Sequence, residues 1–400
     1  MSVLVDSLRH DFITKENTPF LHSLAENGVS GSLKPPPSFS LSPTWFAGLY
    51  PNESGKWGYY YSPETSPHRI LRPFLPVADK IMLTRRLYNV FIWKLFYPYQ
   101  TPALFIPLNL ACYFESNEKL PPWDPNFLPH TTLFDILRKN DLKWLFIGPS
   151  YTDVILKNFA KKISQEISFI FLFFSELDHL CHSKGPTSKS TRETLHIIDS
   201  ALRAIYYKVK KIFHKVDVLV FGDHGSVECR HTVDIEKLLK TIRIKPLKDY
   251  LYFLGGTYAK FWFNSDYSRA VIEKTLTKSR LGKILTNNEL KAYKLNFNHT
   301  RYGELIWYAN KGTLISPNFF NGPIIPKAMH GYLSQVKDNW SAFVLSSHDL
   351  NAKGIKIQTS LNLVDIFPTL LDLLNLEMPD KNRGKSILKE NKIEAQLACG

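Results

Sequence analysis

The sequence predicts an α/β fold in which helices cover both faces of a mostly parallel central sheet. Short apolar runs alternate along the chain with amphipathic helical patterns, and this alternation is typical of such a sheet. The 400 residues are 44% hydrophobic and 14% aromatic, so the chain can bury a large core. We therefore expect a single domain over residues 1–400.

The individual elements follow from these patterns. Five apolar runs are expected to form core strands: 2–5, 144–147, 168–174, 216–220 and 342–345. Four amphipathic stretches are expected to form helices: 18–27, 131–140, 191–213 and 363–374. In open α/β sheets, ligands bind beyond the carboxyl ends of the strands, so polar residues that follow the runs are candidates for a functional site.

Two segments interrupt the alternation. The stretch of about 59–130 is aromatic and rich in proline, and we interpret it as an inserted cap. The stretch of about 245–314 contains a strand-like run at 258–263 and an amphipathic pattern at 268–278, which predict a small subdomain. The cap segment LYNVFIWKLFYPYQ, with basic residues beside it, fits either an aromatic lid over a site or peripheral contact with a membrane surface.

Composition limits the expected partners and location. The net charge of +14 favours an anionic partner, such as a phosphate-containing small molecule or glycan, although the lysines are spread as on a solvated surface. Nucleic acid is not expected, because no recognition motif accompanies the charge. The N-terminus lacks a signal-peptide pattern, no apolar stretch suits a membrane span, and the four cysteines lack metal-type spacing. A cytoplasmic location is expected.

Imidazole and carboxylate side chains stand near the ends of the predicted strands. Alone, each has an ordinary explanation: an Asp after a strand can cap a helix, and an Asp and a His four residues apart can form a surface pair. Together they form an ordered set that predicts a site for two hard or borderline metal ions. The members are Asp6 in VDSLR, Asp178 and His182 in LDHLCHSKGP, Asp223 and His224 in GDHGS, and His330 in HGY.

These motifs resemble the nucleotide pyrophosphatase and type I phosphodiesterase branch of the alkaline phosphatase superfamily. The opening VDSLRHDFITKENTPFLHSLAENGV, the segment GLYPNESG and the C-terminal LNLVDIFPTLLDLLNLEMPDKNRGKSIL resemble further parts of that family, nearly end to end. The resemblance implies an alkaline phosphatase-like three-layer sandwich. It also implies a metal-dependent hydrolase that cleaves a phosphodiester or pyrophosphate bond through a covalent phospho-Ser intermediate.

The resemblance further implies how two divalent metal ions are held. One ion is assigned to Asp178, His182 and His330, and the other to the nucleophile oxygen with Asp6, Asp223 and His224. Zinc is the expected metal, and manganese or iron is the alternative.

The resemblance places a Thr or Ser nucleophile ten residues before the Gly of the Gly-Leu-Tyr-Pro segment. Counting back from Gly48 reaches Ser38, which we predict to be the nucleophile, at the start of the following helix. The run PPPSFSLSPTWFAGLYP lacks the family's usual Thr-Phe-Pro, so three neighbouring hydroxyls stay open as alternatives: Ser40, Ser42 and Thr44. For Ser42, helix capping is a simple alternative role. Ser54 stands where the family commonly has His.

Two other classes of function stay open. A phosphomonoesterase or phosphotransferase could use the same scaffold, whereas the Cys/Ser-x-Pro-x-Arg pattern of the related sulfatases is not found at Ser38. A catalytically inactive metal-binding homologue is the non-enzymatic alternative, and the complete set of six metal-ligand side chains argues against it. The sequence does not indicate the substrate itself.

Overall fold

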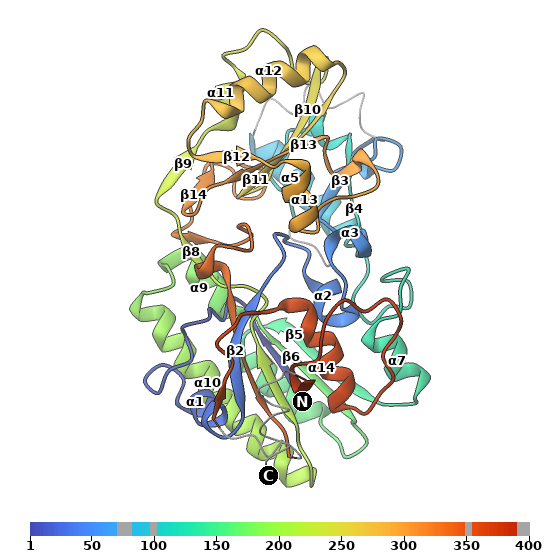
Figure 1. The fold of residues 1–400 in the computed structure, drawn as a ribbon, viewed down its shortest axis with the longest axis vertical. Coiled ribbons are helices and arrows are strands. Elements are labelled where there is room, and N and C mark those ends of the chain that lie inside the picture. The colour runs from blue at the N-terminus through green and yellow to red at the C-terminus, as the bar shows by residue number, and fades with distance from the viewer. Residues whose placement is uncertain (70–81, 97–101, 349–353, 390–400) are drawn as a thin grey trace.

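The structure is a computed structural model that describes residues 1–69, 82–96, 102–348 and 354–389. In the described part, two lobes are stacked along the long axis of the molecule (Figure 1). A large sheet with helices around it forms the lower lobe, and a smaller antiparallel sheet lies in the upper lobe. No described helix is long and apolar enough to cross a membrane.

The large sheet is mostly parallel. Its strands lie in the order β17-β2-β16-β7-β1-β6-β5, and β18 also pairs with β2. Among these described strands, only β16 runs antiparallel to its neighbours, β2 and β7. This arrangement confirms the predicted α/β fold class. The strands are β1 (Ser2–Val5), β2 (Val29–Lys34), β5 (Trp144–Ser150), β6 (Phe169–Phe174), β7 (Val218–Phe221), β16 (Ser341–Ser346), β17 (Ile355–Lys356) and β18 (Leu361–Asn362).

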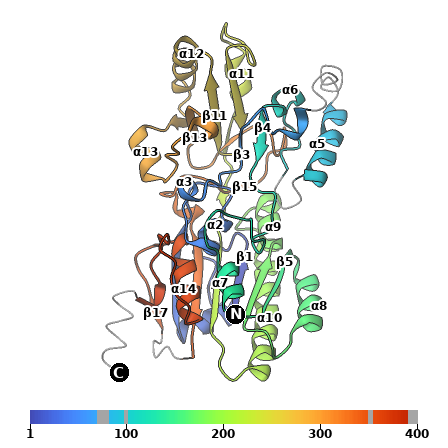
Figure 2. The ribbon, with the colours of Figure 1, turned by 90° about the vertical axis from the view of Figure 1, so that its right-hand side faces the viewer.

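Helices cover both faces of this sheet. Side chains point alternately to the two faces along each strand, and the apolar residues on each face pack against helices. Val3 and Val5 of β1 belong to one hydrophobic cluster, and Leu4 belongs to another. The helices of the first cluster are α1 (Pro19–Glu26), α8 (Thr152–Lys162), α9 (Glu176–Lys184) and α10 (Lys189–Ile212). Those of the second are α2 (Ser42–Ala47), α7 (Leu133–Lys139) and α14 (Ile366–Leu373). Figure 2 shows α8 and α14 on opposite sides of the sheet, as a three-layer sandwich requires.

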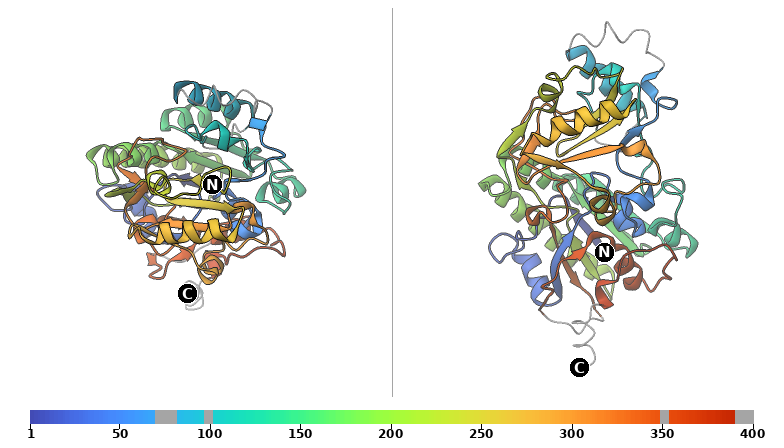
Figure 3. Two further views of the ribbon diagram at one scale, coloured as in Figure 1. Left: turned by 90° about the horizontal axis from the view of Figure 1, so that it is seen from above. Right: turned by 45° about the horizontal axis from the view of Figure 1, so that its top comes forward.

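The upper lobe is built on the antiparallel sheet β10-β11-β13-β12. Helix α12 packs against this sheet, and α11 and α12 lie at the end of the lobe far from the large sheet (Figures 1 and 3). The elements are β10 (Tyr250–Leu254), β11 (Tyr258–Phe263), β12 (Gly282–Ile284), β13 (Leu305–Ala309), α11 (Ile235–Leu239), α12 (Asp266–Thr277) and α13 (Asn287–Ala292).

The two segments predicted as cap and subdomain share one hydrophobic core. Tyr59 and Phe114, from the first segment, lie in the same buried cluster as Phe253 and Trp307, from the second. Their boundaries stay predictions. The remaining elements are α3 (Pro51–Ser54), β3 (Tyr59–Tyr61), α5 (Met82–Phe96), α6 (Leu108–Ala111), β4 (Phe114–Ser116), β8 (Val227–Glu228), β9 (His231–Val233), β14 (Thr313–Ile315) and β15 (Ala328–Met329).

Candidate metal centre

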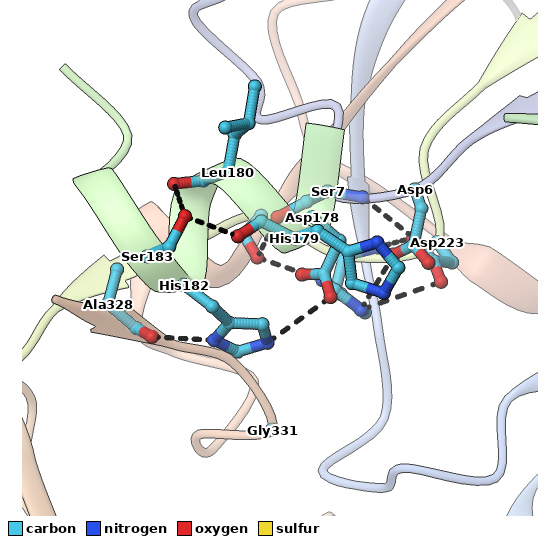
Figure 4. A network of polar contacts seen from close by, with 12 residues as sticks. Asp6, Ser7, Asp178, His179, Leu180, His182, Ser183, Asp223, Ala328 and Gly331 are labelled. Carbon is cyan, nitrogen blue, oxygen red and sulfur yellow. Dashed lines mark hydrogen bonds and ion pairs between the residues drawn. The ribbon is translucent and has the colours of Figure 1, made fainter. Parts of the chain in front are cut away.

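The predicted metal ligands lie at the carboxyl edge of the large sheet. Asp6 directly follows β1, and the Asp-His pair that begins at Asp223 follows β7. Asp178 lies in the first turn of α9, just after β6, and His330 directly follows β15. Since parallel strands end at the same edge of a sheet, the side chains that follow β1, β6 and β7 converge, and the separate pairing of β15 with β8 holds His330 near them. Figure 4 shows Asp6, Asp178, His182 and Asp223 in one region of polar contacts.

The first cluster joins Asp6, Asp223 and His224. One ligand atom from each lies within 4.8 Å of the others, and His224 Nε2 is 3.4 Å from Asp6 Oδ1 and 3.5 Å from Asp223 Oδ2. His224 Nδ1 lies 2.9 Å from the carbonyl oxygen of Gly225, and this contact leaves Nε2 facing the carboxylates. The backbone N–H of Ser7 donates to Asp223 Oδ1 at 3.2 Å and so orients that carboxylate.

The second cluster joins Asp178, His224 and His330, whose ligand atoms also lie within 4.8 Å of one another. The rings of His224 and His330 stack, with centroids 3.7 Å apart and planes 7° apart. His182 lies beside this cluster, with Nε2 3.2 Å from Asp178 Oδ2 and Nδ1 2.7 Å from the Ala328 carbonyl oxygen. The geometry therefore places His224 in both clusters. The assignment of His182 as a third ligand with Asp178 and His330 stays a prediction.

Burial and neighbouring charges disturb the protonation of these groups. Burial raises the pKa of Asp6 well above its usual value, and Asp223 and Asp178 raise it further. At Asp178 burial acts in the same direction, but the charge and hydrogen bond of His182 outweigh it and lower the pKa. Burial lowers the pKa of His330 well below its usual value, which favours the neutral imidazole that binds metals. A buried site with three carboxylates is electrostatically suited to cations.

Three buried atoms of the site lack a hydrogen-bond partner among the described residues: Asp6 Oδ1, Asp178 Oδ1 and His330 Nδ1. An unpaired buried polar atom costs about 1–3 kcal/mol, so such atoms are uncommon unless a ligand satisfies them. Divalent cations bind carboxylate and imidazole groups, and mixed ligation of this kind suits zinc and manganese. The donor set therefore fits divalent metal ions.

Two residues that orient the ligands are not predicted by the sequence analysis. Ser7, whose φ is 64°, holds Asp223 through its backbone N–H, and its position inside the VDSLR motif is a signal that could have indicated it. The carbonyl of Ala328 fixes the ring of His182. No sequence signal marks Ala328, because every residue type supplies a backbone carbonyl.

Gly331 follows His330 and offers a test of how the centre is held. Its φ of 76° lies in the left-handed region, and an added Cβ would lie 2.5 Å from the ring of Phe39. We expect Gly331→Ala to cost about 1–3 kcal/mol of stability, to displace His330 and to lower metal content. Thermal unfolding and elemental analysis of the purified protein measure both effects.

The matched control is Gly55→Ala. Gly55 has a similar φ of 68°, but a Cβ there would meet no described atom within 4 Å. This variant carries the backbone strain without the collision, so its metal content should stay at the wild-type level. Equal metal loss in both variants would contradict the expectation that the collision of a Cβ at position 331 with Phe39 displaces His330.

The predicted nucleophile Ser38 lies in a buried loop beside the centre. Its side-chain oxygen accepts a hydrogen bond from the Ser40 N–H at 3.0 Å, and its own N–H donates to the Pro36 carbonyl at 2.8 Å. The ring of Phe39, the next residue, lies 4.9 Å from the ring of His330, so the loop contacts the metal-ligand cluster. The expectation that Ser38 begins a helix is wrong, because α2 begins four residues later.

The alternative hydroxyls have different surroundings. The Thr44 hydroxyl donates to the carbonyl of Leu41 inside the first turn of α2. Ser42 is the first residue of α2, and the residue before it, Leu41, occupies the cap position, so Ser42 is not the helix cap. Ser40 is buried, and its hydroxyl lies beside the carboxyl group of Glu118. The choice of Ser38 among these hydroxyls stays a prediction.

Comparison with known proteins identifies the family. The family described as type I phosphodiesterase / nucleotide pyrophosphatase matches residues 1–333. The chain belongs to this family. Its resemblance to the nucleotide pyrophosphatase branch of the alkaline phosphatase superfamily is thereby confirmed, and membership makes the protein a hydrolase of the phosphodiesterase and nucleotide pyrophosphatase type. A comparison with curated proteins found no match.

Solved structures support the fold. Human ectonucleotide pyrophosphatase / phosphodiesterase 5 is 16% identical, with a TM-score of 0.70 and coverage of 96% of both chains. The murine protein of the same name is also 16% identical, with a TM-score of 0.70 and coverage of 94% of this chain and 95% of that one. An inactive murine variant in complex with AMP has a TM-score of 0.69 at the same identity and coverage. These likenesses confirm the alkaline phosphatase-like architecture.

Proposed function

We propose that this phosphodiesterase uses two divalent metal ions and the Ser38 hydroxyl to cleave phosphodiester or pyrophosphate bonds in nucleotide-like substrates. The observation that carries the proposal is the pair of ligand clusters that share His224 and contain buried polar atoms without a hydrogen-bond partner among the described residues. Zinc is the proposed metal, with manganese as the alternative, because both accept mixed imidazole and carboxylate ligation.

The proposed reaction has two steps at Ser38. In the first, Ser38 Oγ forms a bond to phosphorus, the bond to the leaving alcohol or nucleotide breaks, and the hydroxyl proton passes to water. In the second, water hydrolyses the phosphoseryl ester, which still carries the other substituent of the substrate phosphate, releases that group as a phosphomonoester and restores the hydroxyl. Bound metal ions would stabilise the alkoxide and the charge on the phosphoryl oxygens. Asp6, Asp223 and His224 hold the cation site of the first cluster.

The murine neighbour in complex with AMP supports both the substrate class and the hydroxyl chemistry. That murine protein is an inactive variant with a Thr-to-Ala substitution, which removes a hydroxyl. Its bound AMP is a nucleotide phosphoester, and the net charge of +14 on this chain suits the same kind of anion.

A comparison of diester and monoester substrates tests the proposal. The purified protein, supplied with zinc or manganese, should hydrolyse bis-p-nitrophenyl phosphate faster than p-nitrophenyl phosphate. Dialysis against a chelator should abolish turnover, and added zinc or manganese should restore it. Faster turnover of the monoester would favour the alternative of a phosphomonoesterase or phosphotransferase. Activity that survives complete metal removal would contradict the two-metal mechanism.

We also propose that the upper lobe makes peripheral contact with anionic membranes through α5. Leu87, Phe91 and Leu95 recur every four residues on one side of this helix and are 60–62% exposed. Ile92, about 100° around the helix from Phe91, is 5% exposed. The helix carries basic residues, including exposed Lys94, and its sequence contains no acidic residue. An apolar stripe flanked by cations is typical of helices that bind the surface of a bilayer.

Vesicle sedimentation tests this contact. The wild-type protein should sediment with phosphatidylserine-containing vesicles more than with neutral ones. The triple variant Leu87→Ser, Phe91→Ser and Leu95→Ser should lose most of that binding. Ile197→Ser, which removes an isoleucine 55% exposed on α10, is the control and should bind normally. Equal sedimentation of the triple variant and the wild type would contradict the proposal.

A further inference from the structure

The loop that carries Ser38 is in contact with the upper lobe. We call residues Pro35 to Phe39 the serine loop. It leaves β2 of the large sheet and passes against the upper lobe, where the ring of Phe39 packs 5.8 Å from that of Tyr258. The Pro35 carbonyl accepts a hydrogen bond from the Ser334 hydroxyl at 2.9 Å. The upper lobe therefore influences the conformation of a loop that the lower lobe begins.

The carbonyl of Pro37 accepts two hydrogen bonds from the upper lobe. It accepts one hydrogen bond from Trp57 Nε1 at 2.9 Å and a second from the Tyr308 hydroxyl at 2.8 Å. Trp57 is 2% exposed and Tyr308 is fully buried. A carbonyl oxygen has two lone pairs, so these two donors use its full acceptor capacity.

This carbonyl belongs to the peptide unit that joins Pro37 to Ser38. A peptide unit is planar, so an oxygen held at two points also fixes the N–H and the Cα of Ser38. The Ser38 N–H is in turn bonded to the Pro36 carbonyl at 2.8 Å, which closes a tight turn around Pro37. The position of the Ser38 Cα thus depends on the two donors, while the Ser38 hydroxyl accepts from the Ser40 N–H at 3.0 Å and donates to the Ser40 carbonyl at 3.3 Å.

Trp57 is itself fixed by a buried lysine. Lys260 Nζ donates to the carbonyl oxygens of Trp57 at 3.1 Å and Tyr59 at 2.9 Å, and it lies 3.9 Å from the centre of the Trp57 ring. Lys260 is fully buried on β11, the strand that pairs with the β13 strand of Tyr308. Both donors to the Pro37 carbonyl are therefore built into the core of the upper lobe.

We propose that Trp57 and Tyr308 are positioning residues, which hold the Pro37–Ser38 peptide and thereby keep Ser38 in place beside the metal-ligand clusters. The inference rests on the proposed function, because it takes Ser38 as the nucleophile. Small displacements of a reacting group lower the rate of the chemical step far more than they weaken substrate binding. Residues of the upper lobe thereby affect the rate of the chemical step.

Two conservative substitutions test the inference. Tyr308→Phe removes one hydroxyl and keeps the ring, and Trp57→Phe removes the indole N–H. Each should lower kcat on bis-p-nitrophenyl phosphate about tenfold, because one hydrogen bond to the Pro37–Ser38 peptide is lost. The double variant should lose about a hundredfold or more. KM should stay within about twofold, and metal content should stay at the wild-type level, because neither side chain belongs to a metal-ligand cluster.

Trp262→Phe is the matched control. The Trp262 indole donates to the Thr300 carbonyl at 2.8 Å, and the side chain is 5% exposed in the same core, so the substitution removes the same kind of bond away from the serine loop. It should lower the melting temperature about as much as Trp57→Phe does and leave kcat within about twofold. An equal loss of kcat in the control would overturn the inference, because the effect would then come from the core in general.

The failure of this inference can be told apart from the failure of the proposed function. Wild-type kcat in Tyr308→Phe and in Trp57→Phe, together with an inactive Ser38→Ala, would overturn the positioning role and leave the nucleophile in place. An active Ser38→Ala protein would overturn the nucleophile and with it this inference. If the double variant fails to fold, Tyr308→Phe decides alone, since it preserves the shape of the buried ring.

Discussion

Replacement of His224 by Ala is expected to lower metal binding at both clusters and to reduce turnover about a thousandfold or more, a loss of ~4 kcal/mol in transition-state stabilisation. Among the described ligand groups, His224 is the residue that belongs to both. His224 is also the ring that stacks on His330, with centroids 3.7 Å apart, so its loss removes a ligand of the second cluster and the stacking partner of His330. Elemental analysis and turnover of bis-p-nitrophenyl phosphate measure the effect.

Two further variants sharpen this result. His179→Ala is the control, because His179 is exposed on α9 beside Asp178 and contacts the Tyr151 hydroxyl at 3.0 Å. It should keep metal content and turnover. His182→Ala separates two interpretations. If His182 is a metal ligand, the variant should lose about one ion per chain. If His182 only contacts Asp178, the variant should keep both ions. A His224→Ala protein that retained two ions would contradict the shared role of His224.

The fold could be predicted where its signal is local. The strands expected at 2–5 and 258–263 have the bounds of β1 and β11, since an apolar run with flanking polar residues is visible without knowledge of its partners. The pattern does not predict β2, whose sequence VSGSLK places only Val29 and Leu33 in buried positions. Nor does it predict the antiparallel direction of β16, because the residues of a strand alternate in the same way in either direction.

In the candidate site too, features set by the local sequence could be predicted, and features set by contacts between distant segments could not. Motifs that follow strand ends predict that carboxylates and imidazoles converge, because the strand edge is shared. The stacking of His330 on His224 could not be predicted, since it depends on the pairing of β15 with β8, where Met329 lies opposite Val227. The donors to the Pro37 carbonyl likewise come from distant parts of the chain, and their meeting is a product of packing in the upper lobe.

Replacement of Ser38 by Ala is expected to remove nearly all turnover while folding and metal content stay intact. The substitution deletes one small buried hydroxyl, whose hydrogen bond from the Ser40 N–H at 3.0 Å is worth about 1 kcal/mol to stability. If Ser38 attacks phosphorus, its loss removes the first chemical step and the phosphoserine that follows. Acid-quenched mass spectrometry of the wild type with bis-p-nitrophenyl phosphate should detect a p-nitrophenyl phosphate group on the peptide that contains Ser38, and the variant should show none.

The neighbouring hydroxyls provide the controls for this result. Ser40→Ala, Ser42→Ala and Thr44→Ala each remove one hydroxyl from the same segment, and each should retain turnover and the phosphopeptide if Ser38 is the nucleophile. A Ser38→Ala protein with more than about a tenth of wild-type activity has a barrier change below roughly 1.4 kcal/mol, which is too small for the loss of a nucleophile. The assignment would then move to whichever of the three variants loses both turnover and the phosphopeptide. Because all four hydroxyls lie within seven residues, comparison at equal metal content separates the loss of chemistry from a shift of the loop.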